Sequence, residues 1–167
     1  MQKSCEIRAS RLVDARRDEV FDFLADLENH WRLADRFIEV LTLEREAGGR
    51  AHGGRVRMRG PLGVRRTAAT EVLDADPPQQ LVGVAEVGRR TLAFVRWKLY
   101  DSDGATRVRL EATIDRLESL DRLLLLLGGR RWLERRFGSV LDRLAKHFAR
   151  DKSEREEVSE NAAQGSR

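Results

Sequence analysis

The longest amphipathic pattern of the chain lies near its C-terminal end, between residues 118 and 150. It begins with Leu120 and the leucine run 123–127, and a second apolar group then recurs at spacings of three and four residues. Such spacing is typical of a helix with one apolar face. The second group comprises Trp132, Leu133, Phe137, Val140, Leu141, Leu144 and Phe148. Because so long a stripe must be covered, the pattern predicts a long helix, in two parts, laid across a sheet.

Ahead of this helix the pattern has period two, which is typical of half-buried strands. Residues 106–115 are the clearest case, with Val108, Leu110 and Ala112 on one side of the strand. Turn sequences such as Asp101-Ser102-Asp103-Gly104 separate most of the strands and favour antiparallel hairpins. The predicted strands are residues 5–13, 37–44, 55–59, 64–73, 80–86, 91–100 and 106–115.

Two helices are predicted between the first and second strands. Asp14 is a suitable N-cap for the first helix, and a short second helix carries Trp31 and ends near Asp35. Residues 46–54 contain four glycines and predict a flexible turn without a phosphate-binding fingerprint. The predicted fold is α+β: a curved antiparallel sheet of about seven strands wrapped around a long C-terminal helix. It forms one domain, residues 1–150, followed by a disordered polar tail, residues 151–167.

Strand parity predicts which side chains face the helix. The inward positions include the small residues Ala68, Ala93 and Ala112, which would leave space for an apolar cavity, although a filled core is the alternative. The candidate ligand-binding residues are Trp31, Val56, Met58, Val64, Arg66, Ala68, Val95, Trp97, Val108, Leu110, Leu124, Leu127, Trp132 and Phe137.

Polar groups in this predicted cavity are few. Arg66 shares parity with Val64 and Ala68, so its guanidinium would enter the cavity and require a carboxylate or an anionic ligand group. A strand-end bulge would instead turn Arg66 outward. Tyr100 is the lone tyrosine and a second candidate for a pocket hydroxyl, although its position also fits a strand end. No catalytic residue is predicted.

The amino-acid composition limits the kinds of partner and cofactor that the protein is expected to bind. The charge of +4 comes from 32 basic and 28 acidic residues, which are interspersed and form no basic block for nucleic acid. The single cysteine, Cys5, excludes an internal disulfide and a cysteine-based metal cluster. The three histidines lack ligand spacing and are interpreted as surface residues, so no metal and no cofactor are expected. Without a long apolar span or a secretory core, the expected location is cytoplasmic.

The glycine pair Gly128-Gly129 interrupts the long helical pattern after the leucine run. Each glycine costs about 1 kcal/mol in a helix relative to alanine, which predicts a break or hinge. Residues 123–127 would then form a mobile gate over the cavity. A dimer contact, a transient membrane contact and a short helix packed in the core are the alternatives. A monomer and a homodimer both remain open.

Three segments resemble the START-like superfamily of polyketide cyclases and lipid-transfer proteins, also called SRPBCC or helix-grip proteins. Residues 10–29, SRLVDARRDEVFDFLADLEN, are similar to the first strand and helix of the family. Residues 31–40 are similar to the segment that leads a tryptophan into the second strand, and 103–107, DGATR, to the turn before the last strand. The resemblance covers about residues 5–149, with Ala15 where a proline is usual. It implies an apolar cavity between sheet and helix, and it carries over no catalytic residues.

These observations lead to three hypotheses of function. The first is binding or transport of a hydrophobic small molecule, such as a lipid, an isoprenoid quinone or a polyketide. The second is a polyketide aromatase/cyclase, which needs a positioned acid or base that the predicted inner faces hardly offer. The third is a partner- or membrane-interaction module that uses the run 123–127.

Overall fold

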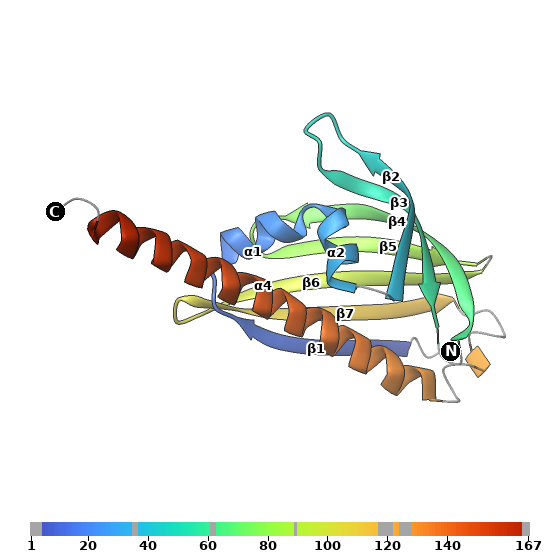
Figure 1. Ribbon diagram of the computed structural model, residues 1–167. Helices are drawn as coiled ribbons and strands as arrows, with labels where there is room; N and C mark the ends of the chain where they lie inside the picture. Colours follow the sequence, from blue (N-terminus) through green and yellow to red (C-terminus); the bar gives the residue numbers. More distant parts are fainter. Residues whose placement is uncertain are drawn as a thin grey trace.

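The computed structural model describes residues 5–34, 37–60, 63–88, 90–116, 122–123 and 128–164. Strand β1 opens the fold, two short helices follow it, six further strands come next, and a long helix closes it (Figure 1). The elements are β1 (Cys5–Val13), α1 (Arg17–Leu24), α2 (Leu27–Ala34), β2 (Ile38–Arg45), β3 (Ala51–Arg59), β4 (Arg65–Asp76), β5 (Gln80–Val87), β6 (Thr91–Ser102), β7 (Ala105–Arg116) and α4 (Arg130–Gln164).

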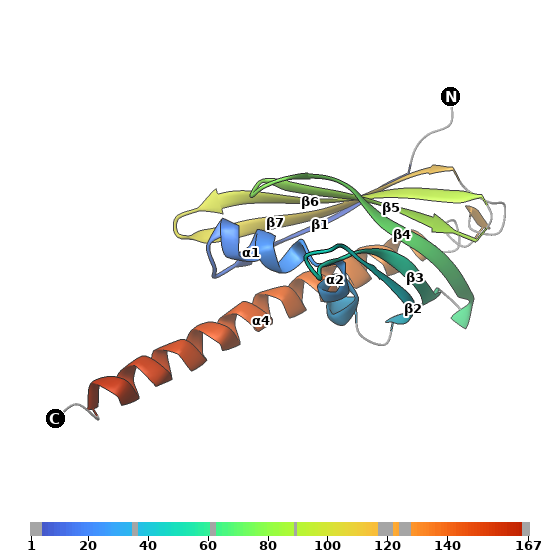
Figure 2. The same cartoon turned by 90° about the horizontal axis from the view of Figure 1, so that it is seen from above.

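Within the described residues, the strands form one seven-stranded antiparallel sheet in the order β1-β7-β6-β5-β4-β3-β2. Strands β2 to β6 each pair with the next strand in sequence, as hairpin turns favour. Strand β1 pairs with β7 and forms one edge of the sheet. The sheet is curved, and α1, α2 and α4 all lie on the same side of it (Figure 2). The predicted α+β helix-grip fold is confirmed.

Side-chain alternation along β6 and β7 matches the predicted parity. Trp97 and Leu99 of β6, and Val108, Leu110 and Ala112 of β7, are all buried. Arg96 and Lys98 lie at the intervening positions of β6, where Lys98 forms an ion pair of 2.9 Å with Glu111 on the other face of the sheet. Period-two alternation therefore separates an apolar inner face from a charged outer face.

Among the residues that the structure describes, buried apolar side chains gather in two clusters. The larger joins β1, α1, β6, β7 and α4 through residues such as Val20, Trp97 and Leu141. The smaller joins α2 to β3 and β4, and it consists of Leu27, Trp31, Ala51, Val56 and Ala68. Residues of both clusters line the candidate site.

Several predicted boundaries were wrong. Helix α1 begins at Arg17 rather than after Asp14, and the carboxylate of Glu19 accepts a hydrogen bond from the backbone N–H of Arg16 at 3.3 Å. Residues 51–54, predicted as part of a flexible turn, are the first residues of β3. Helix α4 continues to Gln164, past the predicted end near residue 150, and its last turns extend beyond the sheet (Figure 1).

Candidate functional site

An apolar cavity of about 310 Å³ lies between the inner face of the sheet and the helices α2 and α4. Strands β3 to β7 supply one wall, with residues such as Val56, Val95 and Ala112. The first turns of α4 supply the opposite wall through Trp132, Leu133 and Phe137. Its volume lies at the lower end of the range for small-molecule sites, roughly 300–1,000 Å³.

Most of the predicted site residues meet in this cavity. Ala68 and Val108 have the predicted inward orientation, but they are fully buried in the two clusters and do not line the space. Leu124 and Leu127 lie outside the described residues. The predicted residues that line the cavity are Trp31, Val56, Met58, Val64, Arg66, Val95, Trp97, Leu110, Trp132 and Phe137.

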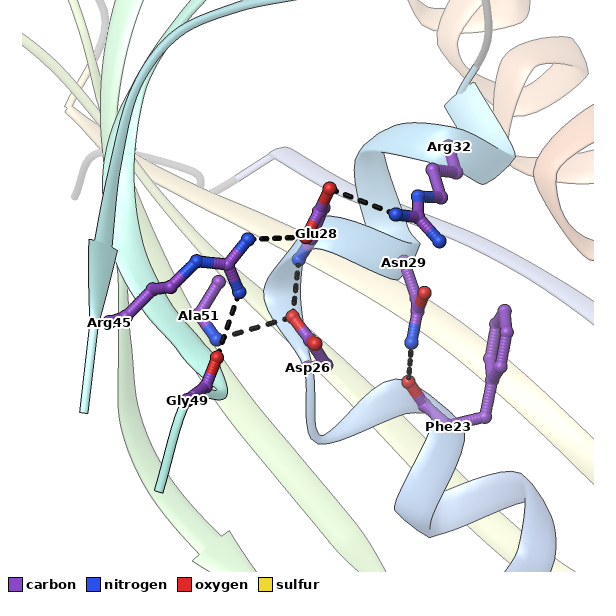
Figure 3. A network of polar contacts seen from close by, with 8 residues as sticks. All are labelled: Phe23, Asp26, Glu28, Asn29, Arg32, Arg45, Gly49 and Ala51. Atoms are coloured by element: carbon purple, nitrogen blue, oxygen red, sulfur yellow. Dashed lines mark hydrogen bonds and ion pairs between the residues drawn. The ribbon is translucent and has the colours of Figure 1, made fainter. Parts of the chain in front are cut away.

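Helix α2 is held in place by the loop that precedes it. Asp26 accepts a hydrogen bond from the backbone N–H of Glu28 at 3.0 Å, which caps the start of α2. The same carboxylate oxygen accepts a bond of 3.2 Å from the backbone N–H of Ala51 at the start of β3 (Figure 3). One side chain thereby fixes the helix start and joins it to the sheet.

Glu28 adds a charged connection between α2 and the hairpin of β2 and β3. Its carboxylate binds Arg45 at 2.6 Å and Arg32 at 3.0 Å (Figure 3). Arg45 also donates to the carbonyl oxygen of Gly49 at 2.8 Å, which fixes the hairpin turn. The hydrogen bond from Arg45, followed by that from Arg32, lowers the pKa of Glu28, so its carboxylate remains charged at neutral pH.

The sequence analysis missed several polar residues of the cavity, of which His30 lies on α2. The others are Thr70, Glu71, Thr91 and Arg136. In α2, Leu27, His30, Trp31 and Ala34 all line the space, at positions i, i+3, i+4 and i+7. That spacing places them on one helix face. The same stripe in the sequence could have identified His30, whose interpretation as a surface residue was wrong.

The His30 ring is held by the end of α1 and by β6. Its Nε2 atom lies 2.6 Å from the carbonyl oxygen of Leu24, and its ring centroid lies 5.1 Å from that of Trp97. Burial lowers the pKa of His30 to about 4, although the contact with Leu24 and the charge of Asp26 act in the opposite direction. The imidazole is therefore neutral at pH 7.

The cationic residues near the cavity are Arg66 and Arg136. Arg66 lines the cavity from β4, as its parity predicted. Arg136 of α4 is exposed, and its guanidinium lies 5.8 Å from the ring centroid of Phe37 and 5.3 Å from that of Trp132. The two rings meet edge to face at 5.2 Å and join the start of α4 to the approach to β2.

Tyr100 does not contribute a hydroxyl to the cavity. Its side chain is exposed, and the guanidinium of Arg109 lies 5.4 Å from its ring centroid. Its alternation with Leu99, which is buried, places it on the outer face of β6. The polar end of a ligand in the cavity would therefore have to meet other residues.

Comparison with known proteins identifies the family. Residues 4–149 match the family model described as "Polyketide cyclase / dehydrase and lipid transport". The chain belongs to this polyketide cyclase/dehydrase and lipid transport family. The match spans the sheet and the cavity-lining part of α4, and it confirms the resemblance to the START-like superfamily. No curated protein matches the chain.

Solved structures share the fold of this family member at low sequence identity. The protein TTHA0849 from Thermus thermophilus is 19% identical, with a TM-score of 0.69 over 88% of this chain and 99% of that one. A START superfamily protein from Mycobacterium smegmatis is 14% identical, with a TM-score of 0.61 over 84% and 97% of the two chains. These likenesses concern the fold alone.

The candidate gate of this polyketide cyclase/dehydrase and lipid transport family member lies mostly outside the described residues. Of the leucine run, Leu123 is described and its side chain is 52% exposed. Gly128, two residues before α4 begins, has a φ of +101°, a backbone conformation that favours glycine. Gly129 lines the cavity. The gate itself remains a prediction.

Neither a metal centre nor a membrane span is found in the part of the chain that the structure describes. Among those residues, no three His, Cys, Asp or Glu side chains gather in a way that could hold a metal ion. No helix among them is long and apolar enough to cross a membrane.

Proposed function

We propose that this protein binds or carries a hydrophobic small molecule in the cavity between the sheet and α4. The observation that carries the proposal is the cavity itself, whose lining is almost wholly apolar and comes from both buried clusters. Lipids, isoprenoid quinones and polyketides are the ligand classes that such a lining favours, and the family description includes lipid transport. Binding would come mainly from removal of apolar surface from water.

The volume limits the apolar part of the ligand. Each methylene that leaves water contributes about 0.8 kcal/mol, which is roughly a fourfold gain in affinity. Affinity within a homologous series of linear alcohols should therefore rise by about this factor per carbon and stop rising once the space is filled. Isothermal titration calorimetry would measure this, and a series with no plateau would place the binding on an open surface instead.

Native mass spectrometry of the protein purified from its own host is the direct experiment, followed by solvent extraction of any bound species. The variant Ala112→Phe adds a ring inside the cavity and should abolish uptake. The variant Thr113→Phe adds the same ring at the next position of β7, which faces the other side of the sheet, and should leave uptake unchanged. A wild-type protein that takes up no lipid, quinone or polyketide probe would overturn the proposal.

One observation supports the alternative hypothesis of an aromatase/cyclase. Such a reaction needs a positioned acid or base, and His30 brings a neutral imidazole to the cavity wall. A cyclase would convert a linear polyketide analogue with repeated turnover and would lose that turnover in His30→Phe. Binding without turnover favours the carrier.

A further inference from the structure

We propose that the α2 wall of the cavity recognises a hydroxyl group on an otherwise apolar ligand, with His30 Nδ1 as the hydrogen-bond acceptor. The inference rests on the proposed binding function and names the polar group that the ligand should carry. It distinguishes alcohols, phenols and enols from ligands whose polar end has only lone pairs, such as ethers, esters and ketones.

The first step is the position of the imidazole proton. Nε2 of His30 lies 2.6 Å from the carbonyl oxygen of Leu24. A carbonyl oxygen can only accept a hydrogen bond, so Nε2 must carry the hydrogen and donate it. In a neutral imidazole the other nitrogen, Nδ1, then holds a lone pair.

The second step is that this lone pair is available. Among the described residues, none donates a hydrogen bond to Nδ1, and the ring lines the cavity. Its environment favours the neutral form, because burial of the ring penalises a positive charge. His30 lines the cavity, and the inference places the lone pair of Nδ1 on the cavity side, where most of the lining is apolar.

The third step concerns the neighbouring indole. Trp97 packs against His30 and is 96% buried, and its Nε1–H has no hydrogen-bond partner within the described part of the chain. A buried donor without a partner is costly. A hydroxyl that donates its hydrogen to Nδ1 keeps an oxygen that can still accept a hydrogen bond, and the residue packed beside the imidazole carries an N–H group without a partner among the described residues.

Other polar groups match this wall less well. An ether, ester or ketone oxygen has only lone pairs, so it would be repelled by the lone pair of Nδ1 and could form no hydrogen bond with it. A carboxylate would do the same and would also lose its hydration in an apolar space, as would an ammonium group. A neutral O–H group avoids both penalties.

The test compares 2-naphthol with 2-methoxynaphthalene, which share a ring system and differ in the hydrogen-bond donor. Calorimetry at pH 7 gives the ratio of the two dissociation constants for each protein. The dissociation constant of 2-methoxynaphthalene divided by that of 2-naphthol should be about fivefold smaller in His30→Phe than in the wild type. A change of this size is expected for the loss of one hydrogen bond. The substituted ring keeps the aromatic contact with Trp97.

Asn29→Ala is the matched control. Asn29 donates to the carbonyl oxygen of Phe23 at 2.7 Å, so this variant also loses a bond between α2 and the last turn of α1, while the residue does not line the cavity. The ratio should not change in this variant. A fall as large as that in His30→Phe would show that loosening of the helix junction, not Nδ1, sets the preference, and would overturn the inference.

A measurement on the unsubstituted protein covers the case in which His30→Phe does not fold. The ¹⁵N resonance of His30 Nδ1 should shift when 2-naphthol binds and stay in place when 2-methoxynaphthalene binds. Binding of both compounds without a selective shift, or with an equal ratio in wild type and variant, overturns the hydroxyl assignment and leaves the carrier proposal intact. If neither compound binds, the hydroxyl assignment fails, and the uptake of lipid, quinone and polyketide probes decides the carrier proposal separately.

Discussion

At the scale of single residues, His30 shows how a surface assignment fails. A histidine without a neighbouring ligand was interpreted as solvated, yet its helix face also carries Leu27, Trp31 and Ala34, and that face lines the cavity. The ring remains neutral because burial outweighs the opposing effects of Leu24 and Asp26 on its pKa. This makes protonation of His30 a measurable cost at low pH.

We predict a loss of stability as the pH falls from about 6.5 to about 4. Over this window the unfolded chain protonates His30, whose ordinary pKa is 6.5, while the folded protein, with a pKa of about 4, does not. The contribution of His30 is complete above pH 6.5 and falls by at most about 3 kcal/mol as pH 4 is approached. Urea unfolding at pH 7 and pH 4.5 would measure it.

The variant His30→Phe isolates this effect, because every other titrating group is common to both proteins. Its free energy of unfolding should change less between the two pH values than that of the wild type. Equal changes in the two proteins would mean that His30 is accessible to protons in the folded state.

At the scale of elements, the start of β3 shows that glycine content does not identify a turn. Gly54 pairs with Leu43 of β2 inside the sheet and has a φ of +153°. A Cβ atom there would overlap the carbonyl oxygen of Thr42 and lie 3.0 Å from the ring of Trp31. The glycine thus allows Trp31 of α2 to lie directly on the sheet.

Gly54→Ala should lower the free energy of unfolding by about 2–3 kcal/mol, because the new methyl group has no space and the backbone conformation disfavours alanine. Gly48→Ala in the adjacent turn is the control, since a Cβ atom there meets nothing within 4 Å. Thermal unfolding of the two variants would measure the difference. Equal stabilities would show that β2 and Trp31 move aside at little cost.

At the scale of the whole molecule, α4 has two different roles along its length. Leu141, Leu144 and Phe148 are buried against the sheet and α1. Beyond them residues 149, 150 and 152–158 are exposed. Ion pairs of Lys152 with Asp14 at 2.8 Å and of Arg155 with Glu19 at 3.4 Å connect this part of the helix to the start of α1. The hydrogen bond with Asp14 raises the pKa of Lys152.

Leu144→Ala should cost about 2–5 kcal/mol, as is usual when a fully buried leucine is truncated. A chain that ends at Arg150 should lose far less, because exposed ion pairs contribute little to stability. Urea unfolding of both proteins tests this. A truncated chain as unstable as Leu144→Ala would assign a structural role to residues 151–164.

The sequence predicted part of the cavity lining, namely which side chains of a strand face inward. Parity identified Val56, Val95 and Leu110 correctly, because neighbouring side chains in a strand point to opposite faces. It also selected Val108 and Ala68, which face inward at points where packed clusters cover them. Parity fixes the face of a strand but not which part of that face a helix covers.

The sequence by itself determined the strands, their antiparallel order and the apolar face of the last helix, because periodicity and hairpin turns are local properties of the chain. Tertiary structure alone decided that a cavity lined by residues of both apolar clusters remains between the sheet and the helices. It also decided that Gly54 lies under Trp31 and that His30 lies beside Trp97. These features depend on the distances at which α2 and α4 pack on the sheet, and such distances arise from contacts between residues far apart in the sequence.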